Sequence, residues 1–241
     1  MTTQYDYRIA IDGLDDALAR SGPRGLQELE ARAHEYETSV KWTLDLISRS
    51  QTGQALLCAI QRTGKKMIIR PWLDTSKINA SAKALNERDA APAGEFALDS
   101  SGRPMTGGHW FWKGPMIGTG KGSDAEIRYA PSMFGFGGWS ASTFAPTSPG
   151  VGQSAILFHE MAHGYRDMRG HQQSVAMVGT RQAYDNEEEF FAILLTNIFV
   201  TDPTTAVQGR RLRADHWSFT ALPATQSTSK GFLQAQGNKR R

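Results

Sequence analysis

The sequence His159-Glu160-Met161-Ala162-His163 places two histidines four residues apart, with a glutamate directly after the first. On a helix, residues four apart project from the same face, so both imidazoles could bind one cation. Glu160 would lie beside this pair and could hold a water molecule on the metal without being a ligand. Zinc lowers the pKa of such a water and polarises a carbonyl group, while the glutamate takes the proton and passes it to the leaving amine. The spacing therefore predicts a catalytic zinc site for peptide-bond hydrolysis.

The competing interpretation is a histidine pair that shares a helix face by chance, or a non-catalytic binding or structural module in which zinc joins two helices. Apolar residues 156–158 precede the motif, Ser148 and Pro149 form a suitable helix start, and Gly170 is a suitable stop. This context favours a buried helix that carries a site. Closed structural zinc sites normally use several cysteines, and the chain has only Cys58.

A catalytic zinc needs a third protein ligand and one open position. The metzincin pattern would place a glycine three residues and a histidine six residues after His163. Arg166 and Arg169 occupy these positions, so that class is excluded. His171 follows Gly170, where the helix is expected to have ended, and is a weak candidate.

Three consecutive glutamates, Glu187, Glu188 and Glu189, begin the apolar stretch 190–200. Such acids usually form a solvated first turn of a helix. Because the apolar residues that follow must be buried, we expect one of the acids to be turned inward. Glu189 is favoured because it directly precedes two phenylalanines, followed by Glu188 and then Glu187.

Hydrophobic patterns elsewhere predict an α+β fold around the motif helix. Helical spacing predicts helices over 24–47, 52–64, 149–169 and 186–200. Alternating or β-branched stretches predict strands over 5–11, 65–72 and 125–131. The polar segment 75–104 is expected to be loop or weak helix.

The chain has 241 residues, which suffices for one substantial core. We expect one domain over 1–241, with a helical N-terminal portion over 1–50 and a C-terminal extension over 203–241. No apolar run reaches the ~18 residues of a membrane span. A net charge of +3 does not predict nucleic-acid binding, although basic residues gather at the C-terminus.

Two motifs carry a resemblance to known families. "HEMAH" followed by "NEEEFFA" resembles gluzincin-type toxin peptidases such as anthrax lethal factor, in which the glutamate before Phe-Phe-Ala is the third zinc ligand. The wider layout, with "TGQALLCAIQRTGKKMIIRP", "GTGKGSDAEIRYAP" and "HEMAHGYRDMRG", is similar to the NleD/HopH-type effector metallopeptidases over about residues 50–200. The resemblance implies a zincin-like fold with a small antiparallel or mixed sheet. It also implies Zn²⁺ bound by His159, His163 and Glu189, with Glu160 as the general base.

The same resemblance implies a secreted bacterial effector or toxin that cleaves a protein or peptide substrate in a target cell. The sequence carries no classical export signal. This absence fits delivery by a specialised secretion system, with the protein cytoplasmic in the producer beforehand. A cognate immunity protein is a possible further partner.

In such folds an edge strand beside the active helix holds the substrate as an added strand, and residues 125–131, "AEIRYAP", are the expected strand. An oxyanion donor is also needed, and Tyr165, Tyr184 and His216 are candidates. The aromatic patch 109–112, "HWFW", is expected to be core or a wall of the substrate groove.

Overall fold

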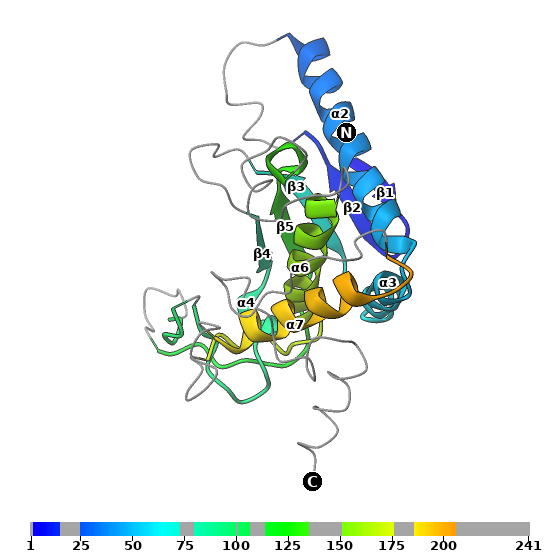
Figure 1. Ribbon diagram of the computed structural model, residues 1–241. Helices are drawn as coiled ribbons and strands as arrows, with labels where there is room; N and C mark the ends of the chain where they lie inside the picture. Colours follow the sequence, from blue (N-terminus) through cyan, green and yellow to red (C-terminus); the bar gives the residue numbers. More distant parts are fainter. Residues whose placement is uncertain are drawn as a thin grey trace.

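The computed structural model describes residues 2–14, 25–72, 80–99, 101–106, 114–134, 151–175 and 186–205. In this part of the chain the predicted α+β class is confirmed: helices pack against a mixed sheet (Figure 1). The elements in chain order are β1 (Thr2–Tyr5), β2 (Ile9–Asp12), α2 (Leu26–Ser48), α3 (Gln51–Arg62), β3 (Met67–Pro71), β4 (Ser81–Ala84), α4 (Glu87–Ala90), β5 (Ala125–Tyr129), the 3₁₀ helix η1 (Pro131–Phe134), α6 (Val151–Met168) and α7 (Glu187–Thr201).

The sheet has the strand order β1-β2-β3-β5-β4. Strands β2, β3 and β5 run parallel, while β1 and β4 are antiparallel to their neighbours. The short strand β4 is therefore an edge of the sheet, and it packs against α6. Among the described strands β4 has a partner on one side only, and it lies beside the helix that carries the histidines.

The core lies between one face of the sheet and the helices α2, α3 and α6. The helical spacing predicted over 24–47 is confirmed, since Val40, Leu44 and Ile47 of α2 are fully buried. Side chains at alternate positions of the parallel strands pack against these helical residues, because successive side chains of a strand point to opposite faces of the sheet. These include Ile9, Ile11, Met67, Ile69, Ala125, Ile127 and Tyr129.

The predicted strand over 5–11 is wrong, because the chain reverses there. β1 and β2 form a hairpin whose turn residues Tyr7 and Arg8 both have positive φ, 63° and 64°. Two positive φ values are typical of a type I′ turn, which normally uses Asn or Gly. Neither residue type is present, so the turn could not be predicted from the sequence. Among the described residues of the N-terminal portion, the helix α2 begins at Leu26.

Two predictions about the substrate strand also fail. Strand β5 was expected at the edge but is flanked by β3 and β4. The segment 75–104, expected without strands, contains β4. Its sequence Ser-Ala-Lys-Ala has four residues with weak β propensity, so pairing with β5 rather than local preference makes it a strand.

Helix α6 ends at a glycine, as predicted. Gly170 has φ +67°, and the amides of Gly170 and His171 donate to the carbonyl oxygens of Asp167 and Arg166. These two bonds form a Schellman motif. The segment Gly118–Gly122, which superficially resembles a phosphate loop, packs its backbone against this helix end instead.

Gly122→Ala is expected to destabilise the fold by about 3 kcal/mol. Gly122 has φ +74°, and an added Cβ would lie 2.0 Å from the carbonyl oxygen of Met168. Gly64 has nearly the same φ, +73°, but open space around a Cβ. Gly64→Ala is therefore the matched control and should cost only about 1 kcal/mol. Urea unfolding measures both, and equal losses would contradict tight packing of this loop on α6.

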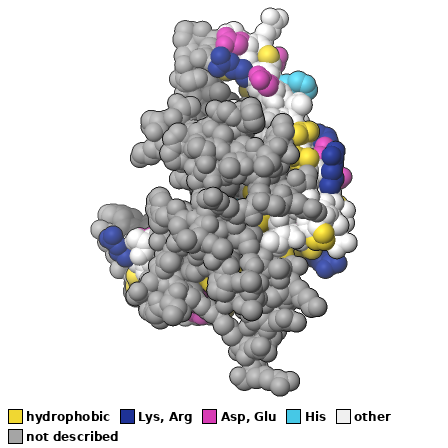
Figure 2. Space-filling model, viewed as in Figure 1, with side chains coloured by type: hydrophobic (Ala, Val, Ile, Leu, Met, Phe, Trp, Pro, Cys, Tyr) yellow, Lys and Arg dark blue, Asp and Glu magenta, His cyan; other side chains and the backbone are white. Residues whose placement is uncertain are grey.

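The exposed side of α2 carries charges of both signs (Figure 2), including the pairs Arg32–Glu28 and Lys41–Asp45. Such exposed pairs contribute little to stability. Among the described residues, no helix is both long enough and apolar enough to cross a membrane.

Candidate metal centre

Helices α6 and α7 together position the predicted site. Phe158 of α6 stacks on Phe199 of α7, with ring centroids 4.4 Å apart and planes 10° from parallel. At the start of α7, the side chain of Asn186 accepts a hydrogen bond of 2.9 Å from the amide of Glu189. This cap fixes the first turn of α7 beside the histidines of α6.

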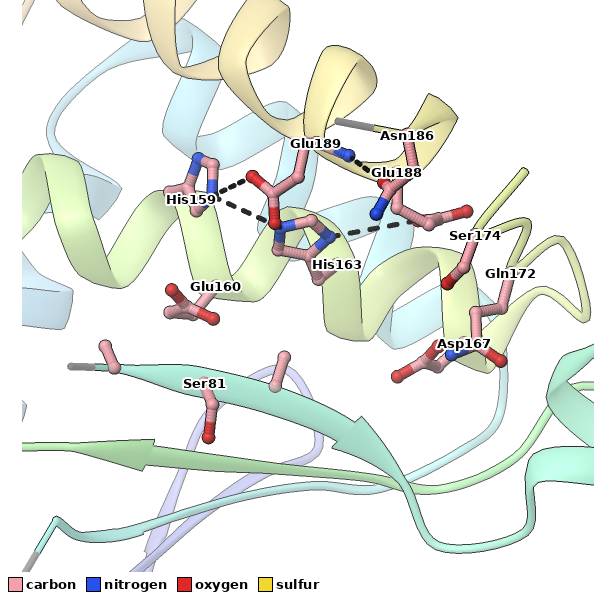
Figure 3. A pocket seen from close by; sticks show the side chains of 12 residues that line it. Ser81, His159, Glu160, His163, Asp167, Gln172, Ser174, Asn186, Glu188 and Glu189 are labelled. Atoms are coloured by element: carbon pink, nitrogen blue, oxygen red, sulfur yellow. Dashed lines mark hydrogen bonds and ion pairs between the residues drawn. The ribbon is translucent and has the colours of Figure 1, made fainter. Parts of the chain in front are cut away.

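The structure brings His159, His163 and Glu189 together (Figure 3). The Nε2 atoms of the two histidines lie 3.2 Å apart. Glu189 Oε2 lies 3.4 Å from Nε2 of His159, and Glu189 Oε1 lies 3.5 Å from Nε2 of His163. One ligand atom from each residue lies within 4.8 Å of the others, so the group could hold a metal ion.

The Nδ1 atom of His159 faces Thr196 of α7. The Thr196 hydroxyl donates to the carbonyl oxygen of Ala192 at 2.8 Å, and its oxygen lies 3.4 Å from His159 Nδ1. Because the hydroxyl proton is already used, the oxygen can only accept from His159. The proton is thus assigned to Nδ1, which leaves the lone pair of Nε2 for a cation.

Glu188 supports His163 from behind. Its two carboxylate oxygens share the N–H of Arg166 Nε, at 2.8 and 2.9 Å, and Oε1 also accepts a hydrogen bond from the amide of Gln173 at 2.5 Å. His163 Nδ1 lies 3.8 Å from Glu188 Oε2, an ion-pair distance. Arg166 is itself stacked over the ring of Phe191. This arrangement orients the imidazole of His163.

Two of the three glutamates are turned inward, where one was expected. Glu188 is buried and Glu189 is four-fifths buried, whereas Glu187 is exposed. The three carboxylates therefore have different surroundings. Glu189 faces both Nε2 atoms, Glu188 faces Arg166 and Nδ1 of His163, and Glu187 faces solvent.

The surrounding histidines favour the anionic form of Glu189. Burial alone would raise the pKa of Glu189, but hydrogen bonds and charges of both histidines hold it well below its usual range. Burial lowers the pKa of His163, yet Glu188 and Glu189 together raise it well above its ordinary value. Glu189 is thus anionic at neutral pH, as a metal ligand must be.

Glu160 borders a pocket of about 420 Å³ between α6 and the edge strand β4 (Figure 3). Its side chain is nearly buried and faces β4 rather than α7. The pocket also contains all three members of the metal group. Its walls are formed by Ala80, Ser81, Ala82, His159, Glu160, His163, Asp167, Gln172, Ser174, Asn186, Glu188 and Glu189.

Other predicted site residues lie elsewhere. Tyr165 does not line the pocket, and its hydroxyl accepts a hydrogen bond from Arg169. His171 is exposed and outside the metal group, as expected. Tyr184, His216 and the patch 109–112 lie outside the described residues.

Sequence reasoning missed Thr196, Glu188 as a support, and Asp167. Arg166 was the available signal for Glu188, because an arginine that follows a histidine motif on a helix expected to be buried needs an acidic partner. No comparable signal points to Thr196.

Fold and site together define an α+β protein with a candidate metal centre of two histidines and one carboxylate. The chain belongs to the Peptidase_M91 effector protein family, whose family model matches residues 27–213. This match confirms the predicted resemblance to effector metallopeptidases and makes the protein a peptidase effector that acts on protein substrates. Neither the search of curated proteins nor that of solved structures gave a match. The family match lends no support to an immunity protein.

Proposed function

We propose that the protein is a zinc-dependent endopeptidase that is delivered into a target cell by a specialised secretion system. In this proposal His159, His163 and Glu189 hold the zinc ion, and Glu160 is the general base. The proposal also assigns the fold to the zincin-like class. The family match supports the peptidase activity and the effector role.

The geometry of the three ligands is the observation that carries the zinc assignment. Zinc binds imidazole nitrogen and carboxylate oxygen at about 2.0–2.2 Å in a tetrahedron, so two of its ligand atoms lie about 3.3–3.5 Å apart. The two Nε2 atoms lie 3.2 Å apart, and each lies 3.4–3.5 Å from a different oxygen of the Glu189 carboxylate. With one ligand atom from each residue, all three lie within 4.8 Å of one another. Magnesium and calcium prefer oxygen ligands, whereas two imidazoles and one carboxylate suit zinc. Three protein ligands leave the fourth position open, as a catalytic site requires.

Bound zinc would supply a Lewis acid that polarises the scissile carbonyl and makes a water molecule acidic. Glu160 follows His159 directly on α6 and points into the pocket toward β4. Its carboxylate can take a proton from the attacking water and deliver it to the amine that leaves. Thr196 and Glu188 hold the two imidazoles in the orientation that this geometry needs.

Strand β4 provides the place for the substrate. It pairs with β5 on one side, and Ala80, Ser81 and Ala82 line the pocket. An extended peptide can add to the other side of β4, which no described strand occupies, through main-chain hydrogen bonds that fix its direction with little dependence on sequence. The peptide would then pass between β4 and α6, in front of Glu160.

Metal removal tests the function. The full-length protein is stripped with a chelator, divided, and supplied with either one equivalent of zinc or buffer. Both samples are incubated with a proteome-derived peptide library, and new termini are identified by mass spectrometry. We expect cleavage to fall at least about a hundredfold without zinc and to return when zinc is added. Equal cleavage in the samples with and without zinc would refute the proposal.

A further inference from the structure

The pocket continues along α6 beyond the metal centre and ends at Asp167. Glu160, His163 and Asp167 are spaced i, i+3 and i+7, so they project from one face of the helix. Figure 3 shows the Asp167 carboxyl beside Gln172, facing the space between α6 and β4. Asp167 is therefore part of the same cavity as the predicted catalytic group, although the proposed reaction does not use it.

The Asp167 carboxyl is buried without a partner in the described part of the chain. The residue is only 3% exposed. Its main-chain oxygen accepts hydrogen bonds from the amides of Ser123 and Gly170, but no described group forms a hydrogen bond or ion pair with its carboxyl. Buried charged groups are almost always paired. A carboxyl that opens only into a pocket is thus placed to meet a group that enters the pocket.

The local charges show which kind of group is missing. Glu87 and Glu188 add negative charge near Asp167. Of the two groups whose positive charge opposes this, His163 belongs to the metal group, and Arg166 already shares its Nε hydrogen between both oxygens of Glu188. The two positive charges of a zinc ion would be matched by Glu189 and Glu160. Consistent with a missing cation, burial and the charge of Glu188 raise the pKa of Asp167 to about 8.

We propose that Asp167 is a specificity-determining residue that binds the side chain of a substrate lysine or arginine near the scissile bond. This inference rests on the proposed peptidase function. Along α6, Asp167 is four residues beyond His163, or about 6 Å. An extended peptide advances about 3.3 Å per residue, so the basic residue lies within about two positions of the bond that is cleaved. Gln172 and Ser174 provide a polar wall around its cationic group.

Dipeptide hydroxamates test this without relying on turnover. The hydroxamate anchors the compound on zinc, and one side chain is lysine, arginine, norleucine or glutamate. Each compound is titrated calorimetrically into the full-length, zinc-loaded wild type, Asp167→Asn and Asp45→Asn. Asp45 is the matched control, because it undergoes the same chemical change but lies on α2 outside the pocket.

For the wild type and Asp45→Asn, we expect a basic side chain at one position to bind at least about tenfold tighter than norleucine. In Asp167→Asn this ratio should fall to about one, with zinc content retained. A wild type that does not prefer the basic compounds, or an Asp167→Asn variant that keeps the preference, would overturn the inference alone. A protein that takes up no zinc and binds no hydroxamate would overturn both this inference and the proposed function.

Discussion

Glu160→Gln is expected to lower kcat/KM for peptide hydrolysis by about 10²- to 10⁴-fold while the protein keeps its zinc and its fold. Glutamine has the shape of glutamate but cannot take a proton from water. Glu160 is nearly buried between α6 and β4, so the isosteric change avoids a cavity there. Since Glu160 is outside the group of possible ligands, loss of its charge should leave metal binding nearly unchanged.

Initial rates on a peptide from the library experiment, together with zinc content by elemental analysis, measure this effect. Glu187→Gln is the matched control, because it makes the same chemical change on an exposed residue of α7. It should keep the wild-type rate. A Glu160→Gln protein with activity within tenfold of wild type would show that another group transfers the proton, and Glu160 would not be the general base.

The motif helix could be predicted from sequence because its information is local. The spacing of His159 and His163 depends only on helical periodicity, and Gly170 marks the end of the helix through its own φ. The inward position of Glu189 follows from the apolar run behind it. In each case the residues that predict the feature lie in the same continuous segment as the feature itself.

The missed features depend on contacts between distant segments. β4 becomes a strand because β5 pairs with it, although its own residues do not favour strand. Thr196 reaches His159 across the packing of α7 on α6, 37 residues away in sequence. Asp167 became notable only when the structure showed that nothing in the described residues pairs with it. Periodicity cannot reveal such relationships, because they are properties of the assembled fold.

The three neighbouring glutamates of α7 should differ sharply in their effect on zinc binding. Glu189→Ala removes the carboxylate that faces both Nε2 atoms, so zinc affinity should fall more than about 100-fold. Glu188→Ala removes the support of His163 Nδ1, and a loss of about 10- to 100-fold is expected. Glu187→Ala should have no effect, because that side chain is exposed.

Competition with a chromophoric chelator measures all three affinities, and circular dichroism verifies that each variant is folded. The fold control matters most for Glu188, because its loss leaves Arg166 without its carboxylate partner in a largely buried place. A larger loss for Glu188→Ala than for Glu189→Ala, in folded protein, would make Glu188 the ligand and would require the first turn of α7 to rotate when metal binds. The expected order, Glu189 before Glu188 before Glu187, follows instead if the Asn186 cap already holds this turn in the metal-binding orientation.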